Sequence, residues 1–383
     1  MTREERRARL VARHRLDRTG VSVERVARDL VGLHSSDPAA VYLSLWARVP
    51  GVTPADVSQL LYERRELLRI YGMRRTLWVV PRDVGEDIDA ACTRKIAEEQ
   101  RRRILGYMER GDWDGDAEVW LDEVSGQVVA ALEQSDEPLT GRQLGDVVPD
   151  MRRKLQMGPG EVGMTTRVLF LLSTDGRITR ARPKGTWVSS QYTWSPFERW
   201  AGAPFIAKDR AEAVANLIER WLASFGPGTL DDLVWWTGLG KREVVAALGD
   251  LEAVEVNLED GVGYLRDCDA AVEVTADRSV ALLPSLDPTT MGWKQRDWYL
   301  GRHAPDLFDR NGNAGPTIWV DGRVVGGWAH HPNGSVVFRF LEPVDSWAEA
   351  RVEAVVGELS EWIGEIRYKP RFPTPLEKAL HSG

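Results

Sequence analysis

The chain has 383 residues, of which 43% are apolar and 28% charged, a composition typical of globular proteins. A chain of this length holds about two to four domains at roughly 100–200 residues each. Its longest apolar stretches are about five residues, against the roughly 18 that a membrane-spanning helix needs. No secretory signal is evident, and the two cysteines could form at most one bridge. We therefore expect a multidomain cytoplasmic protein with reduced thiols and no membrane segment.

The formal net charge of -8 conceals an uneven distribution. Residues 1–107 hold 21 Lys and Arg against 15 Asp and Glu, whereas the rest of the chain holds 29 against 43. Within that acidic remainder, residues 140–200 carry ten basic and five acidic side chains. A phosphate-contacting surface is local, so these two basic segments are compatible with DNA binding, and solvated helix faces are the alternative. Tryptophan is abundant, with 16 residues, which suits packing and, for a minority, stacking on bases.

An order of helices followed by a hairpin recurs along the chain. Thr2 and Glu5 have the spacing of a capping box for a basic opening helix of about 14 residues. Hydrophobic periodicity and start signals then predict helices over 22–32, over 37–48 and from 53 onward, with strands at 67–71 and 76–80. The hairpin tip between these strands is basic, with Arg74 and Arg75. This order is typical of a winged helix.

Two further copies of the pattern follow. The clearest helix-turn-helix lies at 229–251, around Gly238-Leu239-Gly240, and precedes a hairpin of 254–258 and 262–266 with the acidic turn Glu259-Asp260-Gly261. A noisier middle copy comprises a short helix from 139, a helix at 164–174, and a hairpin of 177–182 and 186–190 with a basic tip at 182–185.

After about residue 269 the pattern changes to short alternating strands. These are predicted at 279–283, 317–320, 324–329 and 336–340, with a closing helix at 347–363. The expected fold is therefore α+β, with three tandem winged-helix units (helix-turn-helix plus β-hairpin) followed by a small β-barrel-like C-terminal unit. The expected domains are 1–110 with the opening helix and a candidate catalytic loop, 111–200 with a basic wing, 201–268, and 269–383.

Several segments resemble the bacterial winged-helix DNA glycosylases. Residues 31–38, Val-Gly-Leu-His-Ser-Ser-Asp-Pro, precede Leu-Trp-Ala-Arg at 45–48, much as Gly-Leu-Gln-Ala-Gln-Asp-Pro precedes a Leu-Trp-Ala-Arg helix in that family. Further matches lie at 187–194, 282–288 and 315–326, so the resemblance covers most of the chain. It implies three tandem winged helices and a β-barrel arranged as a C around DNA, and excision of bulky N-alkylated bases.

The resemblance also implies catalytic positions. The family pair is Gln-x-Gln, or Gln-x-Asp in a sister group, and the matching positions hold His34 and Ser36. An N7-alkylated purine is already a cationic leaving group, so the protein mainly places a water and stabilises an oxocarbenium-like sugar. In a loop between two helices, His34 is expected to act on that water as acceptor or general base, because its unperturbed pKa is near 6.5. Ser36 has less reach with its single hydroxyl.

Each of these residues has an alternative interpretation. His34 in a loop also suits a hydrogen bond to backbone or phosphate, and Ser36 suits turn or capping chemistry. Asp37 is a third catalytic candidate beside His34, but Asp directly before Pro38 is what a helix N-cap favours.

For DNA contact, basic residues at the expected wings and in the middle unit are the candidates, because wings reach the DNA backbone or minor groove. These are Arg74, Arg75, Arg152, Arg153, Lys154, Arg182 and Lys184, each with a solvated surface as the alternative. Lys294 and Arg296 beside Trp293 and Trp298 give a weaker basic and aromatic pattern.

The sequence predicts neither a metal site nor a cofactor. His330 and His331 would point to opposite faces of a strand, and no glycine-rich phosphate loop or nucleophile elbow is found. The leading hypothesis is a monomeric, monofunctional DNA glycosylase that hydrolyses the N-glycosidic bond of alkylated purines in double-stranded DNA, in base excision repair or resistance to alkylating agents. The alternative is a non-catalytic winged-helix DNA-binding protein, either a transcriptional regulator or a damage binder.

Overall fold

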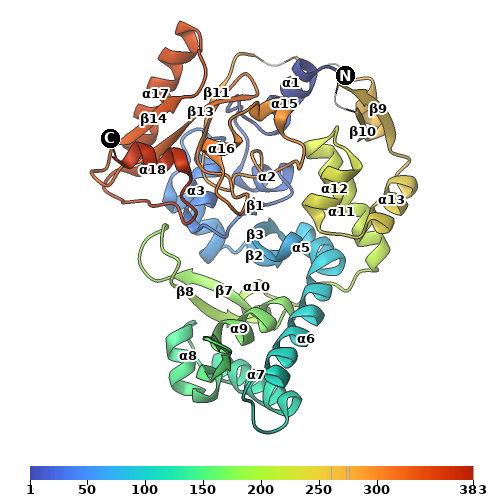
Figure 1. Ribbon diagram of the computed structural model, residues 1–383, viewed down its shortest axis with the longest axis vertical. Coiled ribbons are helices and arrows are strands. Elements are labelled where there is room, and N and C mark those ends of the chain that lie inside the picture. The colour runs from blue at the N-terminus through green and yellow to red at the C-terminus, as the bar shows by residue number, and fades with distance from the viewer. Residues whose placement is uncertain (260, 273, 276, 383) are drawn as a thin grey trace.

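The structure, a computed structural model, describes the whole chain except Asp260, Glu273, Ala276 and Gly383. It is a mixed α+β fold, and every strand pairing between described residues is antiparallel. Figure 1 shows a lower part made from the middle of the chain, coloured cyan to green, and an upper part that contains both chain ends. The first hairpin of the chain lies where the two parts meet.

The N-terminal region opens with the predicted capping box. Thr2 and Glu5 exchange hydrogen bonds between side chain and backbone at the start of α1 (Arg3–Arg13). The elements that follow are α2 (Val23–Asp29), β1 (Leu33–His34), α3 (Pro38–Trp46), α4 (Pro54–Ser58), a π-helical turn (Gln59–Glu63), β2 (Leu67–Gly72) and β3 (Thr76–Pro81). The predicted helices and hairpin are present. The three strands form a sheet in the order β1-β3-β2.

The lower part has a hydrophobic core of its own. Its buried side chains include Ile104, Leu121, Val168 and Leu172. Two elements, α5 (Arg82–Ile88) and a π-helical turn (Asp89–Thr93), follow the first hairpin and bury their side chains in the core of the upper part. The lower part then comprises α6 (Arg94–Arg110), α7 (Ala117–Gln134), β4 (Leu139–Thr140), α8 (Gly141–Val147), β5 (Lys154–Met157), β6 (Gly160–Gly163), α9 (Thr165–Thr174), β7 (Ile178–Pro183) and β8 (Tyr192–Pro196). Helix α10 (Phe197–Ala201) again packs against the upper core. The long helix α6 connects the two parts (Figure 1).

The predicted second strand of the middle hairpin is wrong. Residues 186–190 form no strand, and the partner of β7 is β8, which begins at Tyr192. The indole of Trp187 instead packs against Tyr42 and Trp362, with ring centroids 5.4 Å apart in both cases. A contact with the upper part of the molecule therefore fixes these residues as a loop, and a pattern of alternating side chains cannot reveal such a contact.

The helices and hairpin predicted at 229–266 are present, and a long helix that was not predicted, α11, precedes them. The elements of this third unit are α11 (Arg210–Phe225), α12 (Leu230–Thr237), α13 (Lys241–Asp250), β9 (Val254–Leu258), β10 (Gly261–Leu265) and α14 (Asp267–Ala270). Thr229 and Asp232 form a capping box at the start of α12, and Gly238 ends that helix in the left-handed region, at φ 72°. The predicted turn between β9 and β10 includes Asp260, which lies outside the described residues.

The C-terminal region contains a four-stranded antiparallel sheet in the order β11-β12-β13-β14. Its elements are β11 (Val280–Leu283), α15 (Asp297–Leu300), α16 (Ala304–Leu307), β12 (Thr317–Val320), β13 (Arg323–His330), β14 (Val336–Phe340), α17 (Ser346–Ile363) and α18 (Pro375–Ser382). The four predicted strands and the closing helix are all present. In the described sheet β11 and β14 form the two edges.

A buried ion pair joins the N-terminal and C-terminal regions. Arg48 and Asp287 are 0% exposed, and two guanidinium nitrogens meet the two carboxylate oxygens at 2.7 and 2.9 Å. The Ser44 hydroxyl and the Thr289 N–H donate to the same carboxylate, and Arg48 also donates to the His14 carbonyl. These partners hold the pKa of Asp287 below its usual value, although burial alone would raise it. Arg48 and Asp287 lie in two of the segments that carry the family resemblance, so one buried contact connects these segments across 239 positions.

Candidate active site and nucleic-acid interface

His34 lies in a strand, and the expected loop between two helices is therefore wrong at this residue. Leu33 and His34 form β1 and pair with Val79 and Trp78 of β3. Two residues are too few to show the alternating pattern of a strand, so this strand is recognised only from its pairing with β3. The imidazole is 4% exposed and meets the Trp78 indole edge to face, with ring centroids 5.1 Å apart. The sheet and Trp78 therefore fix the orientation of His34.

The electrostatics of the site keep His34 neutral. Burial, followed by the positive charge of Arg74, lowers the pKa of His34 to about 3. The backbone N–H of Ser36 donates to Nδ1 at 3.4 Å, so the proton of the neutral ring sits on Nε2. Within the described chain, Nε2–H has no hydrogen-bond partner. His34 can therefore offer a fixed N–H donor, whereas the predicted base function at this nitrogen would need the other tautomer.

The next residues anchor the turn from β1 into α3. The Ser36 hydroxyl is partly buried and accepts a long hydrogen bond, 3.5 Å, from Leu77 N–H. Asp37 is the N-cap of α3, which confirms the capping alternative: one carboxylate oxygen accepts from Ala39 N–H and the other from Arg371 N–H, each at 3.1 Å. Burial raises the pKa of Asp37 despite these bonds.

Arg371 belongs to a C-terminal segment that the sequence analysis did not connect with the site. Its guanidinium donates to the Ser36 carbonyl at 3.1 Å, in addition to the backbone bond to Asp37. The side chains of Tyr368 and Glu377 lie near Asp37, and burial with the nearby Asp37 charge raises the pKa of Glu377 to about 7. The residues after α17 thus hold the turn that carries Ser36 and Asp37. No sequence pattern around Arg371 indicates its contact with that turn.

The first expected wing tip is packed against neighbouring helices. Arg74 is half-buried, and its guanidinium lies over the Trp235 indole at 4.0 Å from the ring centroid. Arg75 donates to the Gln100 side chain at 2.7 Å and lies over the Phe170 ring at 5.2 Å. Both residues have a positive φ, of 53° and 62°, in the turn between β2 and β3. The turn is therefore held against neighbouring elements, whereas an exposed wing was expected.

The other predicted DNA-contact residues are exposed, except the half-buried Arg153, and most of them pair with acids. Arg153 contacts Asp114 at 2.8 Å and lies over Trp113, and Lys154 contacts Glu161 at 2.6 Å. Arg152 pairs with Asp146, and Arg182 pairs with Glu63 at 2.5 Å. Lys184 is exposed, and its side chain has no hydrogen-bond partner among the described residues. Exposed pairs of this kind are weak, so these cations can exchange a carboxylate for a phosphate.

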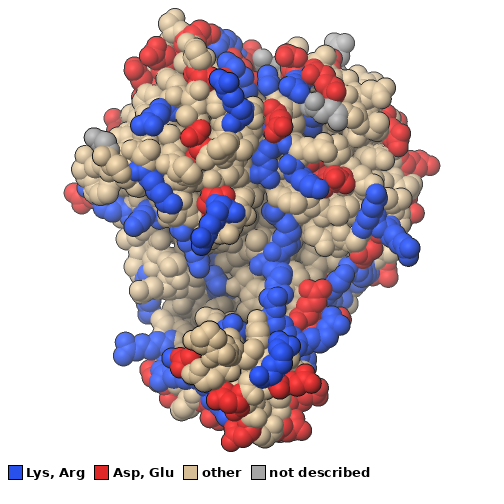
Figure 2. Space-filling model, in the orientation of Figure 1, with Lys and Arg blue, Asp and Glu red and all other residues tan. Residues whose placement is uncertain are grey.

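Basic side chains gather along the middle of one face of the molecule. Figure 2 shows Lys and Arg in a band beside a hollow between the upper and lower parts, while Asp and Glu lie mainly around the rim. The course of α6 in Figure 1 coincides with the lower half of this band. The exposed basic residues of that helix are Arg94, Lys95, Arg102, Arg103 and Arg110. The excess of basic residues in 1–107 is evident from the sequence, but the long helix that presents part of this charge was not predicted.

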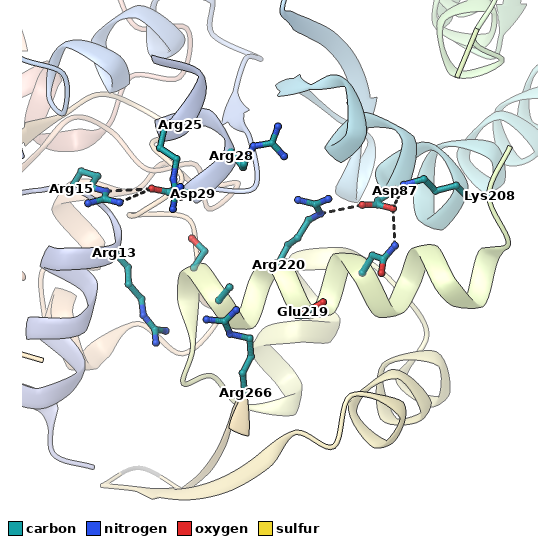
Figure 3. Close-up of a pocket in the computed structure, with 13 residues that line it drawn as sticks. Arg13, Arg15, Arg25, Arg28, Asp29, Asp87, Lys208, Glu219, Arg220 and Arg266 are labelled. Atoms are coloured by element: carbon teal, nitrogen blue, oxygen red, sulfur yellow. Dashed lines mark hydrogen bonds and ion pairs between the residues drawn. The ribbon is translucent and has the colours of Figure 1, made fainter. Parts of the chain in front are cut away.

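A separate pocket of about 600 Å³ is lined mainly by cationic side chains (Figure 3). The cationic residues are Arg13, Arg15, Arg25, Arg28, Lys208, Arg220 and Arg266. Each of them pairs with a carboxylate: Asp29, Asp83, Asp87 and Asp269 each serve two of these cations. Figure 3 shows the pairs around Asp29 and Asp87. The seven cations of this pocket therefore share four carboxylates, and each cation has an acidic partner within the protein.

The described residues contain no cluster of three His, Cys, Asp or Glu side chains suited to a metal ion. Both cysteines are free; Cys92 is buried, which raises the pKa of its thiol to about 12. No described helix has the length and apolar character needed to cross a bilayer.

Comparison with known proteins defines the class. The chain belongs to a family of DNA glycosylases, because the model of the family described as "DNA glycosylase AlkZ-like" matches residues 27–363. Membership makes DNA the substrate and DNA repair the setting of this protein. Among solved structures, the chain resembles DNA glycosylase AlkZ of Streptomyces sahachiroi, with a TM-score of 0.72 and 19% identity over 94% of this chain and 97% of that chain. At that identity the likeness shows a shared fold. No curated protein sequence matches the chain.

Proposed function

We propose that this protein hydrolyses the N-glycosidic bond of alkylated purines in double-stranded DNA. The observation that carries the proposal is the environment of His34, at the position that corresponds to the first glutamine of the family pair. This imidazole is neutral, held by Trp78 and the Ser36 N–H, and keeps one N–H donor free. A glutamine amide offers the same N–H donor chemistry, so the substitution preserves one function of the replaced side chain.

The chemistry follows from the substrate class. An N7- or N3-alkylated purine carries a positive charge, so its C–N bond breaks without a strong acid, and the sugar becomes an oxocarbenium-like cation. Water then adds to that cation. We assign the His34 Nε2–H to hold this water through one lone pair, and the Ser36 hydroxyl to accept a hydrogen bond from it. The proton that the water loses as it bonds to the sugar passes to bulk water. Asp37, with both oxygens bound to backbone N–H groups, is assigned as a positioning residue that fixes the turn.

We further propose the winged-helix arrangement expected from the sequence, with units at 1–110, 111–200 and 201–268 and a barrel-like unit at 269–383. Support comes from the recurrence of short helices followed by the hairpins β2–β3, β7–β8 and β9–β10. DNA is proposed to bind as a duplex to one protein monomer along the basic band of Figure 2, with Arg152, Arg153, Lys154, Arg182 and Lys184 as phosphate contacts. Resistance to alkylating agents is the corresponding biological proposal.

The test is single-turnover base release from duplexes that carry one N7-alkylguanine or one N3-alkyladenine. We expect wild-type protein to release the alkylated base and His34→Ala to be about 100-fold slower, a cost typical of losing one positioned donor. His34→Gln should recover part of the rate. Because the pKa of His34 is lowered to about 3, its imidazole stays neutral between pH 5 and 8, and its contribution should be constant across that range.

His331→Ala serves as a control, because this partly exposed histidine lies outside the site. Equal rates for wild type and His34→Ala would remove His34 from the mechanism. Duplex binding without release of any alkylated base would favour the second candidate, a non-catalytic damage binder or regulator, which the replacement of both family glutamines by His34 and Ser36 makes worth testing.

A further inference from the structure

Arg74, whose charge acts on His34, shares one aromatic platform with a second arginine, Arg296. The guanidinium of Arg74 lies 4.0 Å from the centroid of the Trp235 ring, and that of Arg296 lies 5.2 Å from it. Arg296 also lies over Phe308, at 4.6 Å from the ring centroid. Aromatic faces orient a guanidinium without neutralising its charge. This group of four residues is called the arginine platform below.

Neither cation of the platform has an acidic partner. Within the described chain, the side chains of Arg74 and Arg296 make no hydrogen bond and no ion pair, and Arg74 Nε is buried without a partner. Burial, followed by the charge of Arg296, lowers the pKa of Arg74 to about 10. The pocket of Figure 3 differs in this respect, because each cation there pairs with a carboxylate. Two adjacent, partly desolvated guanidinium groups without a counter-charge form a site for an anion.

The surrounding structure builds the platform from three separate segments. Arg74 sits in the β2–β3 turn at φ 53°, with its backbone packed close to Gly238 at the end of α12. Asp232 of α12 accepts hydrogen bonds from the backbone N–H groups of Lys294 and Gln295, each at 2.8 Å, which holds the loop of Arg296 beside Trp235. The left-handed conformation of Arg74 is unfavourable for this residue type, and such strain is typical of functional sites.

The platform is coupled to the candidate catalytic residue. Arg74 is the charged side chain whose field acts on the His34 imidazole. The aromatic rings that connect them are in contact: His34 packs on Trp78, and Trp78 packs on Trp236, the neighbour of Trp235 in α12. An anion bound at the platform therefore lies on the same part of the molecule as a base held at His34.

We propose that Arg74 and Arg296 form a clamp for one phosphodiester of the DNA strand whose alkylated nucleotide is held at His34. The clamp extends the proposed function, because it names the groups that fix the backbone beside the reacting sugar. Guanidinium groups suit this task since their planar N–H forks match phosphate oxygens. The clamp holds the sugar in place while the base leaves, so losing it should affect both affinity and the rate of excision.

The test measures binding of a duplex with one tetrahydrofuran abasic analogue against salt concentration, together with release of N7-alkylguanine. Arg74→Gln and Arg296→Gln should each weaken binding about 10-fold at low salt and lower the slope of log K against log salt by about 0.9. Lys294→Ala is the matched control. It removes the same charge two residues from Arg296, but this lysine is exposed and pairs with Asp231 at 3.2 Å.

Neutral methylphosphonate linkages, placed one at a time along the lesion strand, give a readout with the unaltered protein. A neutral linkage at one position close to the lesion should weaken binding by the wild type. The same linkage should cause no further loss of affinity in Arg74→Gln or Arg296→Gln.

If the two glutamine variants bind and excise like Lys294→Ala, while the wild type is active, the clamp is overturned and the proposed function stands. If the wild type binds duplex DNA but excises nothing, the proposed function fails. The methylphosphonate scan then shows by itself whether Arg74 and Arg296 bind one phosphate near the lesion. A wild type that binds no duplex overturns both.

Discussion

Arg48 and Arg74 occupy contrasting environments in the same molecule. Arg48 is fully buried and makes five hydrogen bonds, among them a two-pronged pair with Asp287. Arg74 is half-buried, lies on an indole, and has no acidic partner among the described residues. Both side chains are partly or wholly removed from water, which is costly for a charge unless something compensates it. In the first case the fold supplies the compensation; in the second, we infer that DNA supplies it.

The comparison separates residues that build the structure from residues that we propose to act on a ligand. Arg48 and Asp287 both lie in segments that resemble the glycosylase family, yet their side chains are inaccessible and hold the N-terminal and C-terminal regions together. Arg74 and Arg296 lie outside the segments that carried the resemblance. A family motif can thus mark a structural contact, and a ligand site can lie beside it in less distinctive sequence.

The largest expected effect comes from breaking the buried pair. Asp287→Ala leaves Arg48 buried without its counter-charge, and we expect a loss of about 3–5 kcal/mol in the free energy of unfolding. The matched control is Asp122→Ala, which removes the exposed partner of Arg101 and should cost less than about 1 kcal/mol. Urea unfolding followed by circular dichroism measures both. If Asp287→Ala were no more costly than Asp122→Ala, the contrast drawn above would be invalid.

The elements with strong local signals could be predicted from the sequence. The capping box at Thr2, the helix end at Gly238 and the strands at 317–320 and 336–340 are all observed. Each depends on neighbours within a few residues, so its information is local.

The missed features depend on contacts between distant residues. The strand character of His34 comes from its pairing with Trp78, the loop at Trp187 from the ring of Trp362, and the anchoring of Asp37 from Arg371. No local pattern records such partners. The functions of His34, Ser36 and Asp37 and the proposed phosphate contacts remain predictions, because the geometry reports where these side chains lie and experiments must report what they do.

A second prediction concerns His14, which belongs to the network around Arg48. The Ser224 carbonyl can only accept, so Nε2 of His14 carries the proton, and in the neutral ring the Thr289 hydroxyl donates to Nδ1. Burial, followed by the nearby Arg48 charge, lowers the pKa of His14 to about 3. In the unfolded chain the imidazole titrates near 6.5. The unfolded state therefore binds more protons between pH 6.5 and 3, and stability falls as the pH drops through this range.

At pH 5.5, about one unit below the unfolded pKa, this costs about 1.4 kcal/mol relative to neutral pH. His34 has the same lowered pKa and should add a similar amount. His14→Asn should reduce the loss of unfolding free energy between pH 7 and 5.5 by about half of that sum. An unchanged pH dependence in this variant would show that His14 is protonated in the folded protein, contrary to its position beside the buried guanidinium.

The smallest expected effect concerns Arg182, which differs from both Arg48 and Arg74 because it is an exposed cation with an acidic partner. Arg182 pairs with Glu63 at 2.5 Å, and the two side chains are 51% and 64% exposed. Such a pair contributes little to folding, so Arg182→Ala should change the free energy of unfolding by less than about 0.5 kcal/mol.

If Arg182 binds a DNA phosphate, the Glu63 carboxylate competes with that phosphate. Glu63→Gln should then strengthen duplex binding by a small factor at low salt, and Arg182→Ala should weaken it and lower the salt slope by about 0.9. Adding Lys184→Ala should lower the slope again. If Glu63→Gln leaves the affinity unchanged while Arg182→Ala reduces it, Arg182 acts on DNA only through the general field of the surface. If neither variant has an effect, this wing is not a contact surface, and the cations without acidic partners near His34 carry the binding.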